Sequence, residues 1–112
     1  MQAFVGPGAI AAIAGLRINT FFLSATSIDE RGVLAGNEYD AATKRAFVDA
    51  ADTVVLVSDS SKFSLSSRFR TCPLSRVSML VTDSGILPEQ RAMMERAGIR
   101  VMIAAGVGER DA

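Results

Sequence analysis

The chain of 112 residues carries twelve basic and twelve acidic side chains, so its formal net charge is zero. It contains no histidine and one cysteine, Cys72, which excludes a histidine-dependent catalytic triad, a histidine or thiolate metal site and an internal disulfide. With 49% hydrophobic residues, the chain can form one domain, over residues 1–112, with a single core. Balanced charge argues against a nucleic-acid-binding surface, and nothing requires an oxidising compartment, so we expect a cytoplasmic protein.

Residues 1–16 carry no charge, but Gly6, Pro7 and Gly8 interrupt them, and the stretch is too short to span a membrane. It also lacks the basic lead-in of a signal peptide. We therefore predict no membrane contact, and interpret the segment as a strand tail followed by a helix at residues 9–14. Because this helix is apolar on most sides, it should be buried between a sheet and another layer.

Four apolar runs predict strands, at residues 19–26, 53–57, 77–82 and 99–103. The first two lack polar alternation, which is typical of parallel sheets covered on both faces. Asn37 predicts the start of one helix, and Pro88 predicts the first turn of another, which Gly98 ends. Residues 27–36 and 58–74 are expected to be loops. This alternation of strand and helix predicts an α/β fold, a mostly parallel sheet with helices on both faces.

Polar segments at residues 24–29 and 58–62 follow the first two predicted strands. Ligands of parallel sheets bind beyond the carboxyl ends of the strands, and neighbouring strands bring these ends to one edge. We therefore expect a crevice lined by small hydroxyls, by the carboxylates of Asp29 and Asp59, and by the ammonium group of Lys62. Hydroxyls and carboxylates suit sugar hydroxyl groups and lysine suits a phosphate or carboxylate, so the sequence predicts a polyhydroxylated anion as ligand.

Several motifs resemble one protein family, in the same order and without large gaps from about Val5 to Ile103. They are Gly6-Pro7, Phe22-Leu23-Ser24-Ala25-Thr26-Ser27-Ile28-Asp29 followed by Gly32, Glu38, Lys44-Arg45-Ala46, Asp59-Ser60-Ser61-Lys62-Phe63 and Val81-Thr82-Asp83-Ser84-Gly85. Together they resemble the C-terminal effector domain of DeoR-type bacterial transcription regulators, which sense phosphorylated sugars. The fold of that family is shared with ribose-phosphate isomerases and glucosamine-phosphate deaminases. The resemblance implies that the ligand-binding residues are Lys62, Asp59, Asp29, Thr26, Lys44 and Glu38.

Two departures from the isomerases favour binding without catalysis. Their Gly-Ala-Asp-x-x-Asp loop matches residues 24–29, so that its second aspartate is kept as Asp29 and its first is replaced by Thr26. The glutamate that acts as their base is replaced by Thr43. Proton transfer between sugar carbons needs a positioned carboxylate, which threonine does not supply. We thus expect no catalytic residue, no cofactor and no metal.

The resemblance also implies that two parts of the family's pattern are absent: the winged helix-turn-helix domain, and the first strand of the effector domain with its phosphate-binding loop. We therefore expect a partial effector domain, truncated at its N-terminus, with an ordered core at residues 5–103. DNA would be bound only through the absent domain. An uncovered sheet edge or face predicts self-association, as a homo-oligomer.

Each candidate residue also has a purely structural interpretation. Lys62 would be a solvated lysine, Asp59 would cap a turn, and Asp29 would form an Asx-turn. Lys44 and Glu38 would lie on a helix surface, and Asp83 would form a turn. For the whole chain, one alternative is a sugar-phosphate isomerase or deaminase of the same fold. Another is a non-sensing oligomerisation module.

Overall fold

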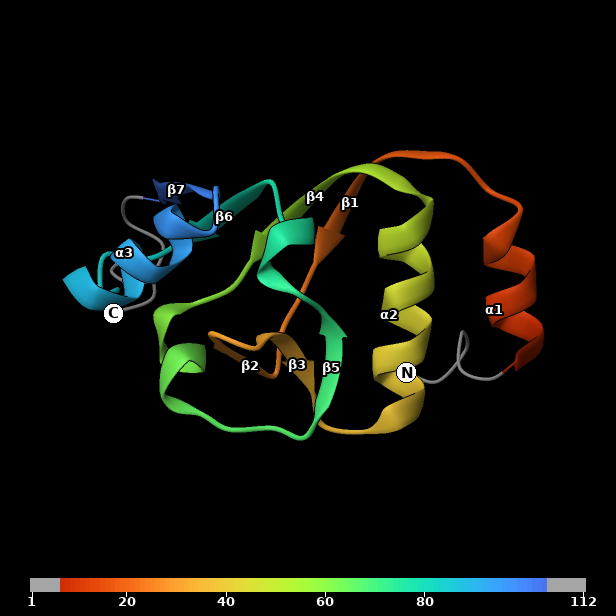
Figure 1. Cartoon of the computed structure of the whole chain (residues 1–112), viewed down its shortest axis with the longest axis horizontal. Helices are drawn as coiled ribbons and strands as arrows, with labels where there is room; N and C mark the ends of the chain where they lie inside the picture. Colours follow the sequence, from red (N-terminus) through yellow and green to blue (C-terminus); the bar gives the residue numbers. More distant parts are fainter. Residues whose placement is uncertain (1–6, 105–112) are drawn as a thin grey trace.

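The computed structural model describes residues 7–104, so the expected strand tail before the first helix, and the residues after 104, lie outside the described residues. Figure 1 labels the elements along the chain. They are α1 (Pro7–Ala14), β1 (Ile18–Leu23), β2 (Ser27–Asp29), β3 (Gly32–Ala35), α2 (Glu38–Ala50), β4 (Ala51–Val57), the 3-10 helix η1 (Ser60–Ser64), β5 (Phe69–Cys72), the 3-10 helix η2 (Leu74–Arg76), β6 (Met79–Thr82), α3 (Pro88–Arg96) and β7 (Arg100–Ile103).

Four parallel strands form the main sheet, in the order β1-β4-β6-β7. Leu23 of β1 lies beside Leu56 of β4, and Leu56 lies beside Leu80 of β6. The segment between β1 and β4 contains α2, and the segment between β6 and β7 contains α3. The predicted α/β class and parallel sheet are confirmed.

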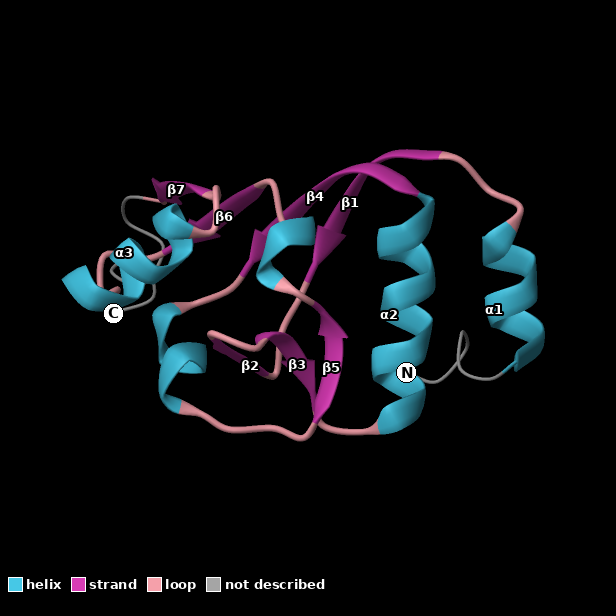
Figure 2. Cartoon of the chain, in the orientation of Figure 1, coloured by secondary structure: helices cyan, strands magenta, loops and turns pink. Residues whose placement is uncertain are grey.

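A second sheet of three short antiparallel strands, in the order β2-β3-β5, packs beside the main sheet (Figure 2). The prediction of a loop at residues 27–36 is therefore wrong, because this segment contains β2 and β3. The prediction of a loop at residues 58–74 is wrong in part, because that segment contains η1 and β5. Ile28 and Val33 pair across the two strands and are fully buried. Gly32 turns the chain between them with a φ of +134°, and a Cβ there would overlap the carbonyl of Cys72. Strands of three and four residues are too short to show a clear alternation in the sequence.

The predicted helix ends are confirmed. The Asn37 side chain accepts a hydrogen bond of 2.8 Å from the amide of Asp40 and so caps α2. Pro88 occupies the first turn of α3, and Gly98 follows that helix with a φ of +87°. The Phe47 ring of α2 stacks on the Phe21 ring of β1 with centroids 5.0 Å apart, which fixes α2 against the sheet.

The hydrophobic core lies on one face of the main sheet. Leu23, Leu56 and Leu80 form a buried row across β1, β4 and β6. Side chains from α2, from the small sheet and from α3 complete the same cluster, namely Val48, Ile28, Val33, Cys72 and Met94. Helices α2 and α3 and the small sheet thus cover the same face of the main sheet.

The opposite face of the main sheet is open to solvent in the described part of the chain. Phe22, Val57 and Met102 are 66%, 47% and 48% exposed. Val57 pairs with Val81, and Val81 pairs with Met102, so an apolar row crosses three strands. The structure therefore differs from the expectation of helices on both faces, although it agrees with the expectation of an uncovered apolar face.

The prediction that the first helix is buried between layers is wrong. Helix α1 packs beside α2, at the end of the molecule away from α3 (Figure 1). Ile13 is buried, whereas Ala11, Ala12 and Ala14 are exposed. Alanine side chains are small, so their exposure costs little free energy, and an apolar composition alone did not require burial. No helix of residues 7–104 is long and apolar enough to cross a membrane.

The Leu56→Ala substitution should lower the free energy of unfolding by about 2–5 kcal/mol, because it leaves a cavity in the buried leucine row. The matched Phe22→Ala substitution removes a larger side chain from the open face, and should change the free energy of unfolding by less than about 1 kcal/mol. Urea denaturation followed by circular dichroism measures both. Equal destabilisation by the two variants would show that the second face is also buried in solution.

Candidate functional site

The candidate site lies at the carboxyl edge of the main sheet, where the four parallel strands end. Ser24 follows β1, Ser58 follows β4, and Asp83 follows β6. Strand β2 packs against η1, so the polar segments that follow β1 and β4 lie side by side, as expected from the sequence (Figure 1).

Asp59 caps the short helix η1. Its Oδ1 accepts a hydrogen bond of 2.9 Å from the amide of Ser61 and another from the Ser61 hydroxyl. The Asp59 carbonyl accepts from the amide of Lys62 at 3.3 Å. The turn-capping interpretation of Asp59 is therefore confirmed. A ligand contact by its exposed Oδ2 remains compatible with this role, because Oδ2 makes no hydrogen bond to another described residue.

Lys62 lies in η1, three residues after Asp59, and its side chain is half-buried. Its ammonium group forms no ion pair or hydrogen bond with any other residue of the described range 7–104. A lysine ammonium that has no partner within the described residues is a suitable group for binding an anion. This is the position at which the sequence predicts a phosphate or carboxylate.

Asp83 links the end of β6 to the start of η1. Its Oδ2 accepts a hydrogen bond of 2.9 Å from the amide of Ser60, and its Oδ1 accepts one of 2.6 Å from the Ser60 hydroxyl. Oδ1 also accepts from the amide of Gly85 at 2.8 Å. The turn-forming interpretation of Asp83 is confirmed by the Gly85 contact, but the link to Ser60 was not predicted. These hydrogen bonds, above all those from Ser60, lower the pKa of the Asp83 carboxyl below its ordinary value.

A cavity of about 160 Å³ opens beside this link. It lies between the ends of β4 and β6 and the residue that follows β7, and it is lined by Val57, Ser58, Asp59, Val81, Thr82, Asp83 and Ala104. A larger cavity of about 400 Å³ lies between α1 and the C-terminal end of α2. Its lining includes Ala51 and Asp52, with which β4 begins, so it lies away from the predicted site.

Asp29 is held by Arg31. The guanidinium donates to Oδ2 at 2.9 and 3.3 Å, and the Arg31 amide donates to Oδ1 at 2.8 Å. Burial raises the pKa of Asp29, but the hydrogen bonds and positive charge of Arg31 outweigh this effect and lower the pKa below its ordinary value. The local-turn interpretation of Asp29 is thus confirmed.

Thr26 is exposed, and its amide donates to the Leu34 carbonyl at 3.0 Å, which joins it to β3.

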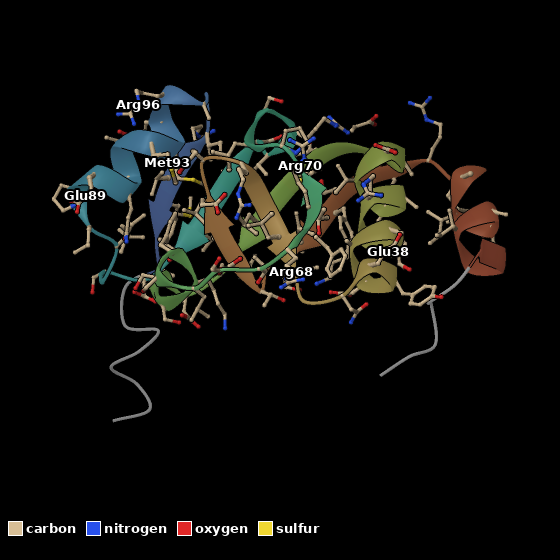
Figure 3. All side chains as sticks on the ribbon, turned by 60° about the horizontal axis from the view of Figure 1, so that its bottom comes forward. Glu38, Arg68, Arg70, Glu89, Met93 and Arg96 are labelled. Atoms are coloured by element: carbon tan, nitrogen blue, oxygen red, sulfur yellow. The ribbon has the colours of Figure 1, made fainter. Side chains whose placement is uncertain are left out.

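Lys44 reaches from α2 to the end of β1. Its ammonium lies 3.1 Å from the Asp40 carboxylate and donates to the Ser24 hydroxyl at 3.1 Å and to the Ser24 carbonyl at 3.4 Å. Lys44 therefore belongs to the edge where the predicted site lies. Glu38 is exposed in the first turn of α2 (Figure 3) and forms no ion pair or hydrogen bond with the described residues, so the structure gives it only a helix-surface position.

Arg76 of η2 and Arg45 of α2 have structural partners. Arg76 donates to the Val48 carbonyl at 2.7 Å, and Arg45 donates to the carbonyls of Arg70 and Thr71.

Burial raises the pKa of the Cys72 thiol to about 11, so this thiol stays protonated and is not a nucleophile near neutral pH. No cluster of three acidic, histidine or cysteine side chains in residues 7–104 could hold a metal ion.

The lowered pKa of Asp83 predicts a specific loss of stability in acid. The hydrogen-bonded Asp83 carboxylate contributes to the free energy of unfolding. This contribution is fully present above the pKa of the unfolded carboxyl, about 3.9, and is lost as the pH falls through the lower pKa of the folded state. Urea unfolding between about pH 6 and pH 3 should therefore show a steeper acid loss for the wild type than for Asp83→Asn. The Glu89→Gln control should keep the wild-type profile, and identical profiles for all three proteins would contradict the prediction.

Comparison with known proteins places the chain in a family. The family model described as the DeoR C-terminal sensor domain matches residues 1–84. A putative aga operon transcriptional repressor of Escherichia coli O157:H7 is 33% identical over 109 residues, which cover 96% of this chain and 39% of that protein. The transcriptional repressor AccR of Agrobacterium fabrum is 35% identical over 86 residues, which cover 75% of this chain and 33% of that protein.

A relative named for the opposite regulatory effect matches over a similar length. The L-fucose operon activator of Haemophilus influenzae is 28% identical over 103 residues, covering 91% of this chain and 41% of that protein. The chain therefore spans 33% to 41% of the length of these three relatives. The motifs at the strand ends and the extent of the family match together show that this chain belongs to the DeoR C-terminal sensor domain family of transcriptional regulators.

Proposed function

We propose that this sensor domain binds a phosphorylated sugar at the carboxyl edge of its parallel sheet, with Lys62 holding the phosphate. The observation that carries this proposal is that Lys62, a half-buried residue in η1, has no ion-pair or hydrogen-bond partner for its ammonium group among residues 7–104. The first amides of η1 already donate to Asp59 and Asp83. Because the backbone of η1 is occupied in this way, the lysine side chain is the group that remains for the anion.

The remaining contacts would be made by groups at the same edge. Oδ2 of Asp59 has no hydrogen-bond partner within residues 7–104, and both Asp59 and its neighbour Ser58 line the cavity of about 160 Å³. Lys44 and Thr26 lie near the end of β1 at this edge. Asp29 could bind the ligand only by giving up its ion pair with Arg31. Glu38 is the weakest member of the proposed set, since it contacts nothing else in the site.

The proposed role is sensing without catalysis. Thr43, which stands where related isomerases carry their base, is a buried hydroxyl of α2 with no hydrogen-bond partner among the described residues. A threonine hydroxyl does not act as a general base at neutral pH, so proton transfer between sugar carbons has no carboxylate at this position. The names of the relatives, which are two repressors and one activator, support the same conclusion.

In a whole regulator, the effector would act by favouring one arrangement of a homo-oligomer. The open apolar face of the main sheet supports an assembled protein, because exposed apolar surfaces of this kind usually bind other protein surfaces. DNA would be bound by a separate domain. The formal net charge of zero argues against this chain as the DNA-binding part, and a role in regulating transcription suits a cytoplasmic protein.

Thermal shift and calorimetry on the full chain test the effector proposal. Millimolar monophosphates of ribose, fructose and glucose should be compared with the free sugars and with inorganic phosphate. At least one sugar phosphate should raise the melting temperature, and Lys62→Gln should weaken its binding about tenfold or more, because a charge-assisted hydrogen bond is lost. The Arg96→Gln control on α3 (Figure 3) should bind as the wild type does.

The same samples decide between the alternatives. Incubation with ribose phosphate should yield no ketose phosphate, and formation of a ketose would identify an isomerase instead. No stabilisation by any phosphorylated sugar would favour a module that only mediates oligomer contacts. Equal binding by the wild type and Lys62→Gln would remove Lys62 from the site.

A further inference from the structure

Hydrogen bonds to two aspartates stabilise the turn between β4 and η1, one aspartate within the turn and one at the end of the neighbouring strand β6. Asp59 binds the amide of Ser61, whereas Asp83, at the end of β6, binds both the amide and the hydroxyl of Ser60. Two carboxylates thus accept hydrogen bonds from the consecutive amides of Ser60 and Ser61 at the start of η1. Of these two carboxylates, Asp83 is the one that joins η1 to the end of a different strand, β6, and it lies 23 residues from Ser60 in the sequence. Hydrogen bonds to a charged acceptor are shorter and stronger than neutral ones.

Gly85 leaves the space that this link requires. A Cβ at residue 85 would lie 2.6 Å from the Ser60 hydroxyl oxygen and 2.9 Å from Oδ1 of Asp83. Its φ lies outside the left-handed region, so the requirement for glycine is one of space rather than of backbone conformation. Any larger residue would push the Ser60 hydroxyl away from the Asp83 carboxylate.

The Asp83 carboxylate is fully engaged in this link. Oδ2 accepts from the Ser60 amide, and Oδ1 accepts from the Ser60 hydroxyl and the Gly85 amide. Each oxygen therefore faces a backbone N–H group. An asparagine at this position would place its own NH₂ group against one of these two amides in either orientation, so even this isosteric change breaks the link.

We infer that Asp83 is a positioning residue for effector binding: it fixes Ser60, and through it the β4–η1 turn that presents Asp59 and Lys62. This inference rests on the proposed function, because it explains how the anion-binding lysine is held in place. Asp83 and Gly85 act through Ser60 and not by contact with the effector. The Lys62 amide is hydrogen-bonded to Asp59, so a shift of the turn moves the lysine backbone with it.

The first experiment measures the turn without ligand. In the full chain, amide hydrogen exchange followed by NMR should show exchange at Ser60 about tenfold faster in Asp83→Asn than in the wild type. Exchange in the core strand β4 should change much less. The Glu89→Gln control removes the same charge from α3 (Figure 3) and should leave exchange at Ser60 unchanged. Unchanged exchange in Asp83→Asn would overturn the inference whatever the ligand proves to be.

The second experiment measures affinity by calorimetry, with the sugar monophosphate that stabilises the wild type most. Asp83→Asn should bind about tenfold more weakly, Ser60→Ala should bind several-fold more weakly, and the double variant should bind like Asp83→Asn alone, because both changes break one link. Additive losses would show that Asp83 contacts the effector directly. Wild-type affinity in both variants would overturn the positioning role while leaving the proposed function intact.

Gly85→Ala provides a variant that removes no polar group. It should weaken binding in the wild-type background and weaken it less in the Ser60→Ala background, where the added Cβ no longer meets a hydroxyl. Circular dichroism checks that each variant is folded. If the wild type binds none of the sugar phosphates, the proposed function fails along with the affinity role of Asp83, and faster exchange at Ser60 would still establish the structural link.

Discussion

Strand β4 pairs in parallel with β1 on one side and with β6 on the other, and this pairing positions both the hydrophobic core and the candidate site. It aligns Leu23, Leu56 and Leu80 in one buried row, against which α2, α3 and the small sheet pack. Because the strands run in the same direction, it also brings their carboxyl ends to one edge. The core and the candidate site are therefore two consequences of the same strand register.

Side chains from other elements hold the segments that leave this edge. Lys44 reaches back from α2 to the residue that follows β1, and Asp83 reaches from the end of β6 to the start of η1. Asp29 is neutralised locally by Arg31, whereas the ammonium of Lys62 has no partner in the described range. At this edge Asp29, Asp59 and Asp83 each accept hydrogen bonds from the protein, whereas the Lys62 ammonium has no partner among residues 7–104, and this difference is the electrostatic basis for expecting an anionic ligand.

The open face of the main sheet gives the domain a second distinct surface. Successive side chains of a strand point to opposite faces, and Phe22 is accordingly exposed between the half-buried Phe21 and the buried Leu23. A parallel sheet is ordinarily covered on both faces, and this one is covered on one face over the residues described. An apolar face and a polar edge on the same sheet would allow ligand binding and assembly to influence each other in a regulator of this family.

From the sequence alone we could predict the α/β class, the main strands, the family and the three helix ends marked by Asn37, Pro88 and Gly98. These features depend on local hydrophobic runs, on single capping residues and on the order of the motifs. Three features could be seen only in the folded chain: residues 27–36 contain two strands, α1 lies beside α2 with its alanines exposed, and Asp83 binds Ser60. The physical reason is that each of these features depends on a contact with a segment distant in sequence. A three-residue strand has no periodicity of its own, a small-residue helix is buried only if something covers it, and a carboxylate at a strand end shows its partner only when the neighbouring strand is in place.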